Sequence, residues 1–313
     1  MKFHVSNLFE QLVSGYCYFG TEMYTADDIK EIETNLEVTV RFLSEKIGQR
    51  SYQDLERLER AAQYIEEKIR SFGCDVKRQT FNYTGNNYHN IIGEVRGRWR
   101  PGEILVIGAH YDTVFGTPGA DDNASGVAGL LELIRLTVLR PSSKTIRFVA
   151  FTLEEPPVFR TRHMGSYIYA KSLKKEKVKV EGMISLEMIG YYCDREGCQY
   201  YPFPFFKWFY PEKGNFIAFV GDISSKAFTK RVKDAFMKAS TLPVESINTL
   251  SIVPGVDFSD HASFWDFGYQ AFMITDTAFY RNPHYHSAGD TANTLDYKRM
   301  ALLICGLKSA LTP

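Results

Sequence analysis

A set of histidine and carboxylate side chains in the last two thirds of the chain has the residue types that bind zinc. Its members are His110, Asp112, Asp122, Glu154, Glu155, Glu187 and His286. Imidazole and carboxylate ligands suit Zn²⁺, and Co²⁺ or Mn²⁺ can substitute for it. A two-metal site with a spare carboxylate, as the adjacent Glu154 and Glu155 would provide, predicts metal-assisted hydrolysis.

The charges of this set favour two ions over one. Asp122, Glu155 and Glu187 supply three negative charges. A bridging hydroxide would supply a fourth, against the four positive charges of two zinc ions. Without metal, three carboxylates so close together would repel one another, and some would stay protonated. We therefore predict two Zn²⁺ per chain, roughly 3.5–4 Å apart.

Alternating strands and helices are predicted to position these residues. The expected strands span 76–83, 90–96, 103–109, 145–153, 180–186, 216–220, 244–249 and 271–275, and the expected helices span 55–72, 123–139, 166–173, 225–239 and a stretch from 296. This alternation predicts an α/β fold, a doubly wound, mostly parallel central sheet with helices on both faces. Ligands bind beyond the carboxyl ends of the strands in such sheets, which is where His110, Glu154 and Glu187 fall.

Domain organisation is expected to be simple. No internal repeat or low-complexity linker divides the chain, so we predict a single domain over residues 1–313. The first fifty residues, rich in polar and aromatic side chains, are expected to pack on it as an N-terminal appendage. Residues 51–54 have the pattern of a capping box and predict that a helix begins there.

The composition excludes several classes of partner. Thirty-seven basic and 37 acidic residues cancel, which argues against nucleic acid or an anionic membrane surface. No apolar run has the length of a membrane span, and the N-terminus lacks the pattern of a signal peptide. We therefore predict a cytoplasmic protein.

Five cysteines fit that compartment. Cys193 and Cys198, the only close pair, could form a disulfide or bind metal. Two reduced thiols are the favoured interpretation, because no second Cys or His pair lies nearby in the sequence.

The order of the motifs resembles the co-catalytic di-zinc exopeptidase family, which includes bacterial leucyl aminopeptidase, glutamate carboxypeptidase II and the glutaminyl-peptide cyclotransferases. The matching stretches are His110-Tyr111-Asp112, Gly119–Gly126, Glu154-Glu155, Glu187–Gly190, Ser259-Asp260-His261 and Tyr285–Thr291. Each motif is weak alone, but the series in this order is specific. The resemblance runs from about residue 110 to the C-terminus and implies the zinc exopeptidase fold.

The resemblance implies a role for each member of the set. Asp122 would bridge the two metals, His110 and Glu187 would complete one zinc site, and Glu155 and His286 would complete the other. The hydroxide held between the ions would attack the scissile carbonyl of a peptide substrate.

Two further residues take supporting roles in the resemblance. Glu154 would be the general base that takes a proton from the attacking water and returns it to the leaving nitrogen. Asp112 would orient His110 through the ring nitrogen that does not bind metal. The family also implies a cis peptide bond between Asp122 and Asn123.

Three residues compete with the assigned ligands or accompany them. Asp121 could replace Asp122, but alignment with the family selects the second aspartate, and Asp121 is expected to be solvated or to cap a helix. His284 could replace His286, but the family motif places the ligand directly before Ser or Thr. Asp260 is expected to anchor its loop and cap the following helix.

These expectations lead to a zinc-dependent exopeptidase, a peptide hydrolase and most simply an aminopeptidase. A glutaminyl-peptide cyclotransferase is an alternative on the same fold, and a non-catalytic binding module is a more distant one. Glu187 stands where aminopeptidases of the group commonly have Asp, which keeps a di-zinc carboxypeptidase or deacylase open.

Two features have no settled role at this level. The aromatic segment 200–210 contains two prolines and cannot be a regular central strand. It could equally form the apolar wall of a substrate pocket or pack against the body. Some family members have an oxyanion-stabilising tyrosine shortly before the Ser-Asp-His motif, but residues 254–258 contain none, so no residue is assigned to that role.

Overall fold

The computed structural model describes residues 16–19 and 22–311. Its strands are β1 (Tyr16–Phe19), β2 (Glu22–Thr25), β3 (Asp75–Tyr83), β4 (Asn86–Val95), β5 (Arg100–His110), β6 (Lys144–Phe151), β7 (Val180–Glu187), β8 (Ile217–Asp222), β9 (Val244–Thr249) and β10 (Ala271–Thr275). Its α-helices are α1 (Ala26–Arg41), α2 (Leu55–Ser71), α3 (Gly126–Leu139), α4 (Gly165–Lys175), α5 (Lys226–Ala239), α6 (His261–Trp265) and α7 (Tyr297–Ala310). The main elements agree with the predicted ones to within a few residues.

An eight-stranded mixed sheet forms the centre of the molecule, in the order β3-β4-β6-β5-β7-β10-β8-β9. The strands β6, β5, β7 and β10 run parallel, which confirms the predicted parallel centre. The flanking strands depart from it, because β4 pairs with β6 and β8 pairs with β10 in antiparallel register. Neither antiparallel pair joins consecutive strands, because β5 lies between β4 and β6 in the sequence and β9 lies between β8 and β10.

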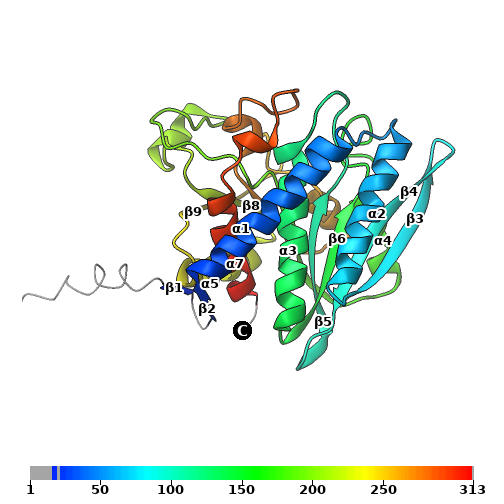
Figure 1. Ribbon diagram of the computed structural model, residues 1–313. Coiled ribbons are helices and arrows are strands. Elements are labelled where there is room, and N and C mark those ends of the chain that lie inside the picture. The colour runs from blue at the N-terminus through cyan, green and yellow to red at the C-terminus, as the bar shows by residue number, and fades with distance from the viewer. Residues whose placement is uncertain (1–15, 20–21, 312–313) are drawn as a thin grey trace, which may run out of the picture.

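Helices cover the two faces of the sheet unequally. Figure 1 shows α1, α2, α3 and α7 in front of the sheet, and their apolar residues join one large core cluster with strand residues such as Ile107, Ile184 and Phe272. On the opposite face, α4 and α6 contribute Leu173 and Phe264 to a smaller cluster. Helices α4 and α6 do not extend over β8 and β9 on this face. There, a third apolar cluster around Val220 is covered by loop residues such as Val253 and Val256.

The N-terminal helices correct one prediction about capping. Helix α2 is amphipathic and buries Leu58, Ile65 and Ile69, but its N-cap is Asp54, whose side chain accepts the amide of Arg57. The predicted box at 51–54 is therefore wrong. A reciprocal capping box is present at Thr25 and Asp28, at the start of α1.

The cysteine expectation is also corrected. Cys193 and Cys198 form a disulfide, whereas reduced thiols were favoured. The intervening turn contains Gly197 with φ +73° and brings the two Cα atoms to 6.4 Å, within disulfide range. In the described part of the chain, no helix is long and apolar enough to cross a membrane.

Candidate metal centre

The predicted ligands come from five segments that meet at one edge of the sheet. The segments are the ends of β5 and β7, the loop after β6, the turn before α3 and the loop after β10, and they carry His110, Glu187, Glu154 with Glu155, Asp122 and His286. Parallel strands bring their carboxyl ends to the same edge, which is why residues far apart in sequence converge here. The structure thus brings together every predicted ligand.

Asp122 lies between two groups of possible ligands. Its Oδ1 is 3.3 Å from His110 Nε2, which in turn is 3.3 Å from Glu187 Oε2. Its Oδ2 is 3.1 Å from His286 Nε2, which is 3.3 Å from Glu155 Oε2. The two oxygens of one carboxylate therefore face two different His–Glu pairs.

These distances fit metal ions. A tetrahedral zinc ion with ligands at about 2.0–2.2 Å separates its ligand atoms by roughly 3.4 Å. Asp122 Oδ1 and Glu155 Oε1 are buried and have no hydrogen-bond partner, as expected for oxygens that face a cation. The donor set of imidazole and carboxylate is also the one that zinc prefers.

Glu154 lies beside these groups at a longer distance from His110. Its Oε2 is 3.9 Å from His110 Nε2, farther than the atoms of Asp122 and Glu187. Distance alone also permits a group of His110, Glu154 and Glu155. Because of this longer separation, Glu154 lies outside the two groups that share Asp122, one with His110 and Glu187 and the other with His286 and Glu155.

Burial and mutual repulsion perturb these carboxylates. Burial raises the pKa of Glu155 to about 8, and the nearby Asp122 adds to the rise. Burial also raises the pKa of Glu154 well above its usual range, although His110 opposes the shift. Burial acts on Asp122 in the same direction, but the two histidines hold its pKa below the ordinary value. Such a set binds protons in the absence of another cation, and a bound metal would displace them.

Asp112 holds the loop after β6 in place. Its two carboxylate oxygens accept the backbone amides of Glu154 at 3.2 Å and Glu155 at 3.1 Å. His110 Nδ1 hydrogen-bonds to the backbone carbonyl of Asp112 at 3.1 Å, and the Asp112 carboxylate is 3.7 Å from that nitrogen. Asp112 therefore contacts both the ring it was predicted to orient and the loop that carries the glutamates.

Neighbouring side chains brace the other ligands. The Asn123 side chain donates to the carbonyl of Leu186 and accepts the amide of Met188, which ties the turn before α3 to the end of β7. The peptide bond between Asp122 and Asn123 is cis, as expected. Ser259, from the Ser-Asp-His motif, donates its hydroxyl to Glu187 Oε2 at 2.8 Å.

Two accompanying aspartates behave differently from expectation. Asp121 is neither solvated nor a cap, because it is fully buried and accepts hydrogen bonds from the Gly190 amide and the Asn282 side chain. Asp260 starts α6 without a capping hydrogen bond, since its buried carboxylate does not reach the helix amides. Burial raises the pKa of Asp260 to about 7, with His110 opposing the rise.

Arg50 links the N-terminal region to the turn that carries Asp122. Its guanidinium is fully buried and donates to the carbonyls of Tyr111, Pro118 and Gly119. Burial lowers its pKa to about 10. Sequence reasoning could not single out this arginine, because its partners are backbone atoms.

Tyr285 is the residue of the site that sequence reasoning missed. Its ring stacks on that of His286 with a centroid distance of 3.8 Å. Burial raises its pKa, and the charges of Asp122 and Glu155 add to the effect. Its position directly before the ligand was the one available signal.

The aromatic segment 200–210 contributes to a pocket next to the metal centre. Tyr200, Tyr201, Phe206 and Tyr210 line this cavity, which also borders Glu187. The segment has a second face, exemplified by Trp208, whose relative exposure is 82%. Of the two open interpretations, a pocket wall is therefore correct for part of the segment.

Comparison with known proteins identifies a peptidase family and relatives that include an aminopeptidase. The profile of peptidase family M28 matches residues 90–304. The chain is 45% identical over 280 residues to the uncharacterized protein YfbL of Escherichia coli, covering 87% of this chain and 85% of that protein. It is 27% identical over 291 residues to leucine aminopeptidase 1 of Trichophyton rubrum, covering 84% and 70% of the two chains.

Solved structures share the fold at lower sequence identity. BSAP, a zinc aminopeptidase from Bacillus subtilis, superposes with a TM-score of 0.71 at 18% identity, over 90% of this chain and 95% of that one. The glutaminyl cyclase of Bacteroides thetaiotaomicron superposes with a TM-score of 0.67 at 18% identity, over 89% and 97%.

Proposed function

Because the chain belongs to peptidase family M28, we propose that it is a zinc-dependent aminopeptidase that removes the N-terminal residue from peptides. One observation carries the proposal. The carboxylate of Asp122 lies between a His110–Glu187 pair and a His286–Glu155 pair, with Glu154 left outside both. This is the arrangement expected of a hydrolase with two metals and a separate proton carrier.

The residues that would hold the metals are the five predicted ligands. Asp122 would be shared, His110 and Glu187 would complete one site, and Glu155 and His286 the other. Bound zinc would supply Lewis acidity, which lowers the pKa of water and polarises a carbonyl. The same donor types would accept Co²⁺ or Mn²⁺.

Glu154 is proposed to transfer a proton from the attacking water to the leaving amine. Its amide is fixed by Asp112, so the side chain is presented to the site from a rigid turn. Its Oε2 would accept a proton from the attacking water and then deliver it to the amine that leaves. Asp112 acts through other residues and is a positioning residue.

Tyr285 is proposed to stabilise the oxyanion. Tyr285 lines the pocket next to the predicted ligand His286, and none of the described side chains forms a hydrogen bond with its hydroxyl. A hydroxyl held by stacking on His286 is preorganised to donate to the oxygen of the attacked carbonyl. This fills the role left open at residues 254–258.

The test is a panel of matched peptides with free and N-acetylated termini. Each is assayed with the purified protein, after chelation, and after zinc is restored and quantified. Cleavage of only the free-amino peptides, lost on chelation and regained with about two zinc ions per chain, is the expected result. Cleavage of the acetylated peptides would favour a carboxypeptidase or deacylase and would contradict the proposal.

A glutaminyl-peptide cyclotransferase is the second candidate, because that class also appears among the structures that share the fold. It would release pyroglutamyl product from N-terminal glutamine and leave the other free-amino peptides intact. Mass spectrometry of the same reactions separates the two outcomes.

Two wider expectations belong with this proposal. A single domain is supported by one core cluster that joins Ile32 and Leu36 of α1 to Leu303 and Ile304 of α7. The Cys193–Cys198 disulfide argues against the expected cytoplasmic location, because disulfides persist mainly in oxidising compartments.

A further inference from the structure

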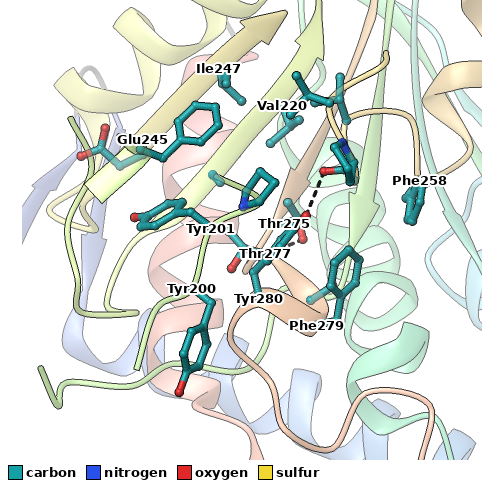
Figure 2. Close-up of a pocket in the computed structure, with 18 of the residues that line it drawn as sticks. Tyr200, Tyr201, Val220, Glu245, Ile247, Phe258, Thr275, Thr277, Phe279 and Tyr280 are labelled. Atoms are coloured by element: carbon teal, nitrogen blue, oxygen red, sulfur yellow. Dashed lines mark hydrogen bonds between the residues drawn. The ribbon is translucent and has the colours of Figure 1, made fainter. Parts of the chain in front are cut away.

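The pocket beside the metal centre lies on the face of the sheet opposite helix α5, which packs against the other face of β8 and β9. It lies over β10, β8 and β9, and Figure 2 shows its floor and walls, with Thr275 and Thr277 near the centre. At one end stand Phe258 and Phe279, and at the opposite end stands Glu245. The pocket therefore has two chemically different ends.

Strand register defines the floor. Glu187 on β7 pairs with Thr275, Thr275 pairs with Ala218, and Ala218 pairs with Glu245. Residues paired in this way project from the same face of a sheet. A metal ligand and Glu245 thus mark the two ends of one row, and the two residues between them have small side chains that leave room for a ligand.

Ring contacts identify which end adjoins the metal centre. Phe258 contacts Phe279, Phe279 contacts Tyr285, and Tyr285 stacks on His286. The Phe258–Phe279 end is therefore the near end. Glu245 lies at the far end, beside Tyr201 in Figure 2.

Aromatic side chains line the way to Glu245 without binding it. The Tyr201 hydroxyl donates to the carbonyl of Pro211, and the Tyr210 hydroxyl donates to the carbonyl of Ser246. Phe206 completes this wall. The rings present their faces and edges to the cavity, and their polar atoms are already occupied.

Glu245 itself is half-buried and forms no hydrogen bond or ion pair with the described residues. Burial raises its pKa, and the positive charge of Lys233 opposes the rise. The Lys233 ammonium donates instead to Ser246 Oγ at 3.1 Å. A carboxylate in this situation would gain from a cation that enters the pocket.

We propose that this pocket binds the side chain of the substrate's N-terminal residue and that Glu245 makes it select lysine and arginine. The inference rests on the proposed aminopeptidase function. Each of these side chains has an apolar stem that can lie along the aromatic wall and a cationic end that can pair with Glu245. The rings add a favourable cation–π interaction along the path.

The length of the pocket agrees with this choice. Three steps between adjacent strands, at about 4.8 Å each, put roughly 14 Å between the Cα atoms of Glu187 and Glu245. A lysine or arginine side chain extends about 6–7 Å from its Cα by standard bond lengths. Alanine or valine would leave the far half empty, and a purely apolar side chain would desolvate Glu245 without a partner.

The experiment compares lysine with norleucine, which has the same stem without the ammonium group. Values of kcat/KM for lysyl, arginyl and norleucyl p-nitroanilides are measured with zinc-loaded wild-type protein, Glu245→Gln and Glu196→Gln. Glu196 is a matched control, because it is an exposed glutamate that pairs with Lys213 and does not line the pocket.

The expected wild-type preference for lysine over norleucine is at least tenfold. Glu245→Gln should reduce that ratio at least tenfold by lowering lysine turnover while norleucine turnover stays the same or rises, and Glu196→Gln should leave it unchanged. A wild-type preference for norleucine, or an equal loss for both substrates in Glu245→Gln, would overturn the inference.

Binding to the Glu154→Gln variant separates failure of this inference from failure of the proposed function. Calorimetry with L-lysinamide and L-norleucinamide needs no turnover. Tighter binding of lysinamide that Glu245→Gln removes supports the pocket assignment even if no peptide is cleaved. Equal binding of the two amides overturns it even if the protein is an active aminopeptidase.

Discussion

The metal centre and the pocket beside it meet at Glu187 but are built in opposite ways. The metal centre collects charged side chains from five segments, all buried except the partly exposed His286, and hydrogen bonds from backbone amides to Asp112 and Asn123 fix its loops. The pocket is largely apolar, with walls from several irregular segments, among them 200–210 and 253–258, and small residues on its floor. Few side chains belong to both the metal centre and the pocket. Substitutions in the pocket should therefore alter substrate preference without altering the reaction chemistry.

The largest expected effect is on the reaction at the metal centre. Glu154→Gln should lower kcat by roughly 10³–10⁴-fold for every substrate, because the proton carrier is lost while the pocket is intact. Zinc content, measured by elemental analysis, should stay at the wild-type level. Near wild-type turnover with full zinc would remove Glu154 from the mechanism.

A second prediction concerns the support of the pocket wall. His261 Nε2 donates to the carbonyl of Val256, which lines the pocket, and burial lowers the pKa of His261 to about 4. The unfolded chain takes up this proton near pH 6.5, so the stability associated with neutral His261 is present above pH 6.5 and is lost as the pH falls toward 4. The loss is on the order of 3 kcal/mol.

His261→Gln keeps a donor for Val256 and removes the titration. Chemical unfolding at several pH values should show a shallower acid loss for the variant than for wild type. Parallel curves for the two proteins would show that His261 titrates normally in the folded state.

The third prediction lies at the border of the two regions. Tyr285→Phe should lower kcat by roughly 10–10²-fold, because a donor to the developing oxyanion is removed while the stacked ring is retained. KM and zinc content should change little. A change in KM alone would assign Tyr285 to substrate binding.

The smallest expected effect tests the independence of the pocket. Ala218→Phe would fill its floor, so kcat/KM for long side chains should fall about tenfold while alanyl substrates are cleaved as before. A steady-state substrate panel measures the two classes together. A uniform loss across side chains would mean that the floor also supports the metal centre.

The convergence of the candidate ligands could be predicted from sequence because its signal lies in residue type and position. His110, Glu154 and Glu187 are titratable residues at the ends of recognisable strands, and parallel strands align those ends. The fold class was predictable for the same reason. Tyr285 was not singled out, because one tyrosine among nineteen carries no signal until its neighbour is known to be a ligand.

The pocket could not be predicted because it depends on strand order and register. Glu245 faces it only because β9 pairs with β8, and β8 pairs with β10, in a particular alignment. A one-residue shift would turn Glu245 to the other face. The buried state of Asp121 was hidden in the same way, since its partners Gly190 and Asn282 are distant in sequence.

Arg50 has a practical consequence for choosing fragments of this protein. The family profile starts at residue 90, yet the guanidinium that holds the carbonyls of Pro118 and Gly119 lies forty residues earlier. A shortened chain cut at the profile boundary would leave these carbonyls without their donor, three and four residues before Asp122. Boundaries drawn from sequence similarity therefore underestimate the length of chain that the catalytic centre requires.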